Sequence, residues 1–182
     1  MKMRMDYNNM LSCRVSDGIT REEFDKLDAL IKKANKAMEE KRAAGKMAWR
    51  DLPYNQEAVV KEINDYVNEK KDEIDAFVVL GIGGSALGPL AVQQALNHPW
   101  WNELPLEKRD GYPKLYVLDN VDPERLVYFF ETVDPTRCLY NVISKSGSTS
   151  ETMSQFMIIQ QLLEEKLGKD GAKSKIVAQQ TR

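Results

Sequence analysis

Residues 76–88 read AFVVLGIGGSALG, a continuous apolar run that passes directly into a turn of glycines and serine. An unbroken run of apolar and β-branched residues is typical of a strand buried on both faces of a parallel sheet. A helical pattern follows from Ala86 to about Leu96. This stretch therefore predicts a strand, a tight turn and a helix, which together open a βαβ unit.

The same alternation continues toward the end of the chain. Three further apolar runs predict strands at 115–118, 139–143 and 175–178. Helices are expected at 123–131, with Asp122 as N-cap, and at 149–167, where Gly168 is a natural stop. Alternating strands and helices predict an α/β fold, a parallel, doubly wound α-β-α sandwich.

The residues before the first strand show helical periodicity instead. Between Thr20 and about Ala44 the apolar residues fall on one helical face, and residues 20–23, TREE, have the form of a capping box. A second helix is expected from about Gln56 to Lys71, with Asn55 as a candidate N-cap. The residues of this helix expected to face inward are Val59, Val60, Ile63, Tyr66 and Val67.

The length allows one globular domain or one domain with an appendage, and we expect a helical segment at 1–74 and a sheet domain at 75–182, which the resemblance described below implies is incomplete. The chain carries 26 Lys+Arg against 28 Asp+Glu, a balance that argues against nucleic-acid and membrane-surface partners. Two cysteines without motif spacing and one histidine give neither a zinc set nor a disulfide framework. No apolar stretch approaches the length of a membrane span, and a cytoplasmic protein is expected.

The first turn, residues 80–88 with the sequence LGIGGSALG, has three interpretations. Its glycines could serve only a tight connection between strand and helix. Gly81, Gly83 and Ala86 also match the dinucleotide pattern G-x-G-x-x-A, but the acidic residue expected about 20 positions later is missing, since Asp119 lies much further on. The third interpretation is an oxyanion site made of backbone N–H groups at a helix N-terminus.

The second turn, residues 143–152 with the sequence ISKSGSTSET, is richer in hydroxyls. In one interpretation Ser148 is merely an N-cap and Glu151 completes a capping box. Capping uses only one or two hydroxyls, which leaves Ser144, Lys145 and Ser146 able to face a ligand. An ammonium among hydroxyls before a helix suits a phosphate monoester, and no Walker pattern points to ATP.

Ligands of open α/β sheets bind beyond the carboxyl ends of strands, where the strand order switches direction. Both turns occupy such ends in the predicted fold. If the strand before Gly81 is central and the strand before Ser144 is its neighbour, one phosphate can contact both turns.

The two motifs together, GIGGS at 81–85 followed by LGP at 87–89, and SKSG at 144–147 followed by Thr149, Glu151 and Thr152, resemble the glucose-6-phosphate isomerase family. The likeness covers roughly residues 75–178. It implies a sugar isomerase (SIS) fold with a parallel five-stranded sheet. It also implies that the 6-phosphate of the substrate is bound by Gly84, Ser85, Ser144, Lys145, Ser146 and Thr149.

The activity that this resemblance implies is the interconversion of glucose 6-phosphate and fructose 6-phosphate through a cis-enediol, in glycolysis and gluconeogenesis, without metal or organic cofactor. Family members are longer, are typically homodimers, and carry their catalytic residues in parts that have no counterpart here. The resemblance therefore implies a chain with the phosphate-binding part alone and no catalytic residue. His98 matches no catalytic position of the family and is interpreted as a surface or capping histidine. The last four residues, QQTR at 179–182, depart from the family's pattern.

Two alternatives come from other classes of protein. A stand-alone SIS module could bind a phosphosugar and regulate a partner, although residues 1–74 show no basic recognition face for DNA. A nucleotide-binding unit would instead use the first turn for a dinucleotide.

Overall fold

The computed structural model describes residues 3–179. Its contacts divide the chain into two compact units, Met1–Lys61 and Glu62–Arg182. The boundary expected from the sequence, between residues 74 and 75, stays a prediction. Residues 180–182, which carry most of the atypical C-terminal sequence, lie outside the described residues.

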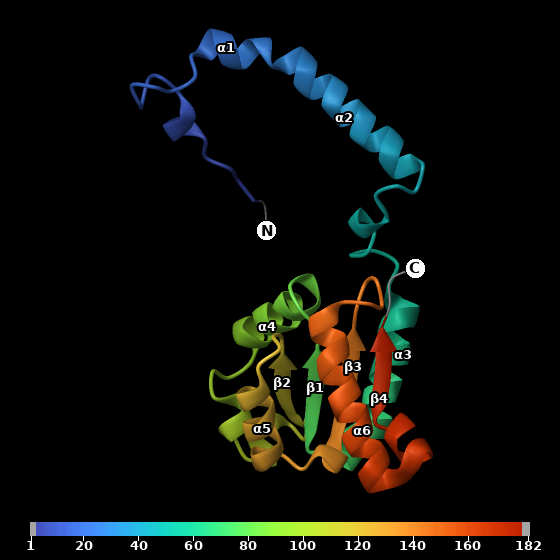
Figure 1. The fold of residues 1–182 in the computed structure, drawn as a ribbon. Helices are drawn as coiled ribbons and strands as arrows, with labels where there is room; N and C mark the ends of the chain where they lie inside the picture. The colour runs from blue at the N-terminus through green and yellow to red at the C-terminus, as the bar shows by residue number, and fades with distance from the viewer. Residues whose placement is uncertain (1–2, 180–182) are drawn as a thin grey trace. The chain divides into compact units, whose positions relative to one another are not determined.

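A parallel sheet forms the centre of the second unit (Figure 1). The part of the chain that the structure describes contributes four strands to it: β1 (Ala76–Leu80), β2 (Lys114–Leu118), β3 (Cys138–Ile143) and β4 (Ile176–Gln179). The strands are ordered β2-β1-β3-β4, and every neighbouring pair is parallel. The predicted doubly wound sheet is confirmed, with β1 between β2 and β3, whereas a fifth strand is not among residues 3–179.

Helices connect these strands as the alternating pattern predicts. The connections are α4 (Gly84–Leu96) after β1, α5 (Pro123–Thr132) after β2 and α6 (Ser150–Lys173) after β3. Asp122 caps α5 as predicted, because its Oδ1 accepts hydrogen bonds from the backbone N–H groups of Glu124 at 3.0 Å and Arg125 at 3.1 Å. Gly168, at φ 73°, interrupts α6 where the stop was predicted, and a short helical stretch follows it. Short 3₁₀ helices lie at Asn8–Met10, Ala48–Arg50, Lys71–Glu73, Trp101–Glu103, Leu106–Arg109 and Pro135–Arg137.

The larger core lies between the sheet and the helices α5 and α6. Its buried members include Val78, Leu80, Leu118, Phe129, Tyr140, Ile159 and Leu163. The Tyr140 hydroxyl donates to the Pro135 carbonyl at 3.2 Å, so the polar end of this buried ring is satisfied. Burial raises the pKa of the Cys138 thiol to about 11, and this cysteine packs as a small, inert apolar group.

The opposite face of the sheet is covered by α4 over a smaller core of Val79, Ala86 and Val117. A cavity of about 420 Å³ lies on this face, and its walls include Phe77, Leu115 and Leu139, which come early in their strands. Because α4 packs on one face and α5 and α6 on the other, the direction of the connections reverses at β1.

The second predicted helix is observed as α3 (Glu57–Lys70), but two expectations about it are wrong. Asn55 is not its N-cap: the helix begins two residues later, and Asn55 has a φ of 56° instead of the extended backbone that an N-cap adopts. Four of the five residues of the predicted inward face are exposed, with exposed fractions of 49% at Val59, 50% at Val60, 55% at Ile63 and 37% at Tyr66, whereas Val67 is half-buried. Helical periodicity identifies an apolar stripe, but only its end at Tyr66 and Val67 borders the cavity on the sheet, and the rest stays exposed within residues 3–179.

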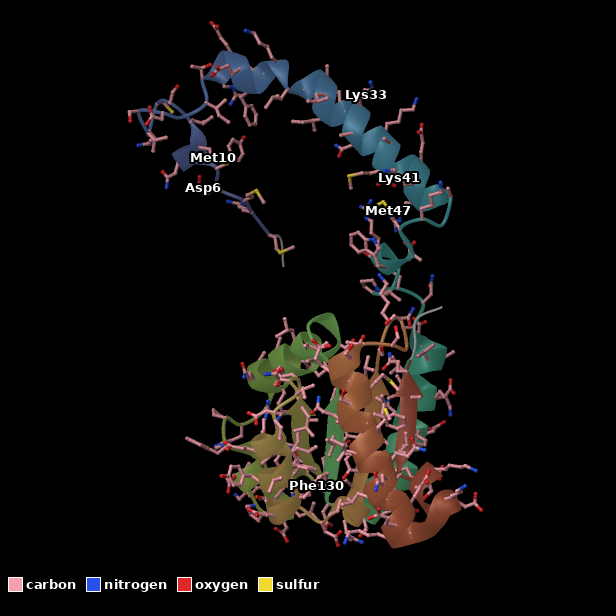
Figure 2. All side chains as sticks on the ribbon, viewed as in Figure 1. Asp6, Met10, Lys33, Lys41, Met47 and Phe130 are labelled. Carbon is pink, nitrogen blue, oxygen red and sulfur yellow. The ribbon has the colours of Figure 1, made fainter. Side chains whose placement is uncertain are left out.

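The first predicted helix is observed as two, α1 (Arg21–Lys26) and α2 (Asp28–Ala43), which meet at Leu27. The predicted capping box is confirmed: Thr20 Oγ1 accepts from Glu23 N at 3.2 Å and Glu23 Oε2 accepts from Thr20 N at 2.9 Å. Lys33 and Lys41 project from α2 (Figure 2). None of residues 3–61 is buried, and none of the helices within residues 3–179 is both long and apolar enough to span a bilayer.

The link from β1 to α4 depends on a glycine at position 81 because there is no room for a side chain. A Cβ added to Gly81 would lie 2.8 Å from the Cβ of Ser85 and 2.9 Å from its carbonyl oxygen. Such approaches are closer than van der Waals contact, and one of the atoms is backbone. The close packing of Gly81 against Ser85 therefore holds the first turn of α4 next to the end of β1.

We expect Gly81→Ala to lower the free energy of unfolding by about 1–3 kcal/mol, the usual cost of overpacking a filled site. Gly88→Ala is the matched control, because no atom lies within 4 Å of a Cβ added at this position inside α4. Replacing a helical glycine by alanine should raise the stability by roughly 0.5–1 kcal/mol. Denaturant unfolding measures the free energy of unfolding of both variants, and equal stability of the two would contradict the packing argument.

Candidate functional site

The predicted site residues lie in the two connections that leave β1 and β3 at the carboxyl edge of the sheet (Figure 1). Leu80, the last residue of β1, pairs in register with Val142 of β3. Neighbouring strands are about 4.8 Å apart, so the residues that follow them start side by side. The structure thus confirms that the strand before Gly81 is interior to the sheet and that the strand before Ser144 is its neighbour.

The connection after β1 presents the open N-terminus of α4. Gly83 is the N-cap, and its φ of 54° with ψ of −120° is a conformation that favours glycine. The N–H groups of Ser85 and Ala86 donate to the carbonyls of Ile82 and Gly83, at 3.1 Å and 3.0 Å. Within residues 3–179 the N–H groups of Gly83 and Gly84 have no protein acceptor, so they are available to an oxyanion.

The connection after β3 is shaped by its own hydroxyls. Ser144 is buried, and its Oγ accepts a hydrogen bond from Gly147 N at 3.0 Å and lies 3.1 Å from Thr149 Oγ1. Ser146 Oγ accepts from both the backbone N–H and the hydroxyl of Ser148, at 3.2 Å and 3.1 Å. These contacts are local, and they fix the course of the turn without using the backbone N–H groups of Lys145 or Ser146.

The predicted N-cap of α6 is wrong. The helix begins at Ser150, so Thr149 is the N-cap, and its side chain makes no capping hydrogen bond. The Ser148–Glu151 capping box is therefore not formed, because Ser148 bonds Ser146 and Thr149 bonds Ser144. In the described part of the chain, the first N–H groups of α6 consequently remain without acceptors from the protein.

Lys145 places a positive charge at this edge. Its side chain is exposed, and no carboxylate of residues 3–179 lies within ion-pair distance of its ammonium. The positive ends of α4 and α6 add to this charge, because the peptide dipoles of both helices begin at the same edge of the sheet. Of the six residues predicted to bind phosphate, Lys145, Ser146 and Gly84 are exposed, Ser85 and Thr149 are half-buried and Ser144 is buried.

Thr152 belongs to the second motif, and the sequence pattern assigns it no role. In the structure Thr152 lies in the first turn of α6 and is 1% exposed, and its hydroxyl has no partner among the described residues. No pattern in the sequence separates such a threonine from one that merely fills the core.

Asp119, the acidic residue that the dinucleotide interpretation offers for a nucleotide ribose, pairs with Arg125 instead. Arg125 donates from Nη1 to Asp119 Oδ1 at 2.6 Å and from Nη2 to the Val117 carbonyl at 2.8 Å. A carboxylate held in this way is a poor candidate for two ribose hydroxyls. The geometry therefore speaks against the dinucleotide interpretation.

His98 is exposed, and its Nδ1 accepts a hydrogen bond from Trp100 N at 3.0 Å. The predicted surface or capping role is confirmed. Since it follows the end of α4 rather than its beginning, His98 lies away from the carboxyl edge of the sheet.

Comparisons with known proteins agree with this geometry. The family model for phosphoglucose isomerase matches residues 55–182. The glucose-6-phosphate isomerase of Carboxydothermus hydrogenoformans is 40% identical over 170 residues, which are 93% of this chain and 36% of the relative. The chain thus spans little more than a third of the length of that curated relative.

Two solved structures resemble the chain. A hypothetical protein from Thermus thermophilus is 32% identical with a TM-score of 0.70, over 87% of this chain and 35% of that protein. A glucose-6-phosphate isomerase from Chlamydia trachomatis is 24% identical with a TM-score of 0.53, over 65% of this chain and 21% of its own, and supports the fold alone. Since the family match includes the sheet and both turns at its carboxyl edge, the chain belongs to the phosphoglucose isomerase family.

Proposed function

We propose that this chain is the phosphate-binding part of a glucose-6-phosphate isomerase and that it holds the phosphate of a hexose 6-phosphate between its two turns. The observation that carries the proposal is that two helix N-termini start at neighbouring strand ends, with backbone N–H groups that have no acceptor within residues 3–179, beside a lysine with no ion-pair partner there. This combination suits a dianion that is bound from several sides. The names of the curated relatives support the substrate class.

Each turn supplies a different kind of group. The turn after β1 offers the N–H of Gly84 and the hydroxyl of Ser85. The turn after β3 offers the Lys145 ammonium and the hydroxyls of Ser146 and Thr149, while the buried Ser144 supports them from within the turn. Lysine acts here as a point charge that tolerates rotation of a phosphate monoester.

In the complete reaction, a carboxylate would move a proton between C1 and C2 of the open-chain sugar through a cis-enediol. No residue of this chain is assigned to that step. The role of the two turns is to anchor the end of the sugar that does not react. Binding energy from this remote phosphate can then position C1 and C2 against the base. We place the activity in the cytoplasm and expect a homodimer for the full-length protein.

We expect Lys145→Ala to weaken the affinity for glucose 6-phosphate by about 1–3 kcal/mol, the scale for losing a hydrogen bond to a charged group. Stability should hardly change, because the side chain is exposed. Lys169→Ala, an exposed lysine near the other end of α6, is the matched control and should bind as the wild type does. Calorimetric titration measures both, and an unaltered affinity of the Lys145 variant would remove this residue from the site.

The chain alone should bind the sugar phosphate without converting it. A coupled assay starting from fructose 6-phosphate should show no turnover above background, because none of the proposed groups can shuttle the proton. Turnover in the ordinary enzymatic range, about 1–10³ per second, would show that a catalytic base lies within these 182 residues.

A further inference from the structure

Thr152 lies near the starts of both turns. The sheet-facing side of α6 consists of the buried residues Thr152, Gln155, Ile159, Leu163 and Ala172. The helix packs against β1 and β3, the two strands from which the turns leave. Because α6 begins at the carboxyl edge, Thr152 is the member of this side that lies closest to the starts of both turns.

Burying the hydroxyl of Thr152 costs free energy in the folded protein. It is inaccessible to solvent and has no hydrogen-bond partner among the described residues. An unmade hydrogen bond in a buried position carries the full penalty of desolvation, whereas a valine of the same shape would carry none. Packing therefore does not explain why this position holds a threonine.

The neighbour that can use this hydroxyl is Thr149. Thr149 is the N-cap of α6 and Thr152 is the third residue of the helix, the two positions whose groups meet in a capping box. The Thr149 hydroxyl now lies 3.1 Å from Ser144 Oγ. A hydroxyl has one donor and two acceptor positions, so Thr149 can donate to one group while it accepts from another.

We infer that Thr152 is a positioning residue of the phosphate site: when the Thr149 hydroxyl donates a hydrogen bond to an oxygen of the bound phosphate, the Thr152 hydroxyl donates one to Thr149 Oγ1. The result is a chain of hydroxyls, Thr152 to Thr149 to phosphate, in which each hydrogen bond polarises the next. The free protein bears the desolvation penalty of the unpaired Thr152 hydroxyl, and the compensating hydrogen bond forms only when the ligand is bound. Thr152 therefore contributes to affinity rather than to stability. This inference rests on the proposed function.

The test is a double-mutant cycle with Thr149→Val and Thr152→Val, read as the dissociation constant for glucose 6-phosphate. Thr152→Val should weaken binding about fivefold, the size of one ordinary hydrogen bond, without lowering the free energy of unfolding. In the Thr149→Val background the same change should have no further effect, because the hydroxyl through which Thr152 acts is gone. Thr152→Ser should bind within about twofold of the wild type.

Thr132→Val is the matched control, since the hydroxyl of this exposed threonine of α5 donates to the Tyr128 carbonyl, at 2.7 Å, and to no other group within residues 3–179. Unchanged affinity in Thr152→Val, or effects of the two valine substitutions that simply add, would overturn the inference. A loss of stability in Thr152→Val well beyond that of Thr132→Val would overturn it as well, by revealing a partner in the free protein. If Lys145→Ala and Thr149→Val also leave the affinity unchanged, both the proposed phosphate site and the inference about Thr152 are wrong. If these two variants weaken binding and Thr152→Val does not, only the inference about Thr152 is wrong.

Discussion

The parallel pairing of β3 beside β1 is the constraint on which the rest of this structure depends. Parallel neighbours present their carboxyl ends at one edge, so the turns that follow Leu80 and Ile143 must begin side by side. The helix after β1 packs on one face of the sheet, and the helices after β2 and β3 pack on the other. Two helix N-termini therefore approach the same edge from opposite faces, which is the place where open α/β sheets bind their ligands.

Within that edge, side chains and backbone have separate tasks. The hydroxyls of Ser144, Ser146 and Ser148 form hydrogen bonds inside the second turn and determine its course. Among residues 3–179 the first N–H groups of α4 and α6 have no protein acceptor and remain for solvent or ligand, and at an exposed helix end this costs little. Thr152 is different, because its buried hydroxyl has no hydrogen-bond partner within residues 3–179. Under the proposed function, local hydrogen bonds hold the site in shape and its remaining hydrogen bonds form with the bound anion.

Much of the sheet domain could be predicted because its signals are strong and local. A strand buried on both faces, such as Ala76–Leu80, shows as an unbroken apolar run, and Asp122 before Pro123 is a clear N-cap signal. The N-cap of α6 could not be predicted, because five hydroxyls compete within a few residues and only the three-dimensional turn decides between Ser148 and Thr149. The exposure of Val59, Val60 and Ile63 on α3 could not be predicted either, since periodicity identifies an apolar stripe and not the element that covers it. The role of Thr152 could not be predicted for a related reason, because no sequence pattern shows that a buried hydroxyl lacks a hydrogen-bond partner.

The claim that both turns grip one phosphate is tested most directly by amide NMR during a titration with glucose 6-phosphate. The account predicts that the signals of Gly83 and Gly84 and those of Lys145 and Ser146 shift together, with a single dissociation constant, and that glucose without phosphate leaves all four unmoved. Shifts confined to one turn, or two turns that titrate with different dissociation constants, would contradict it.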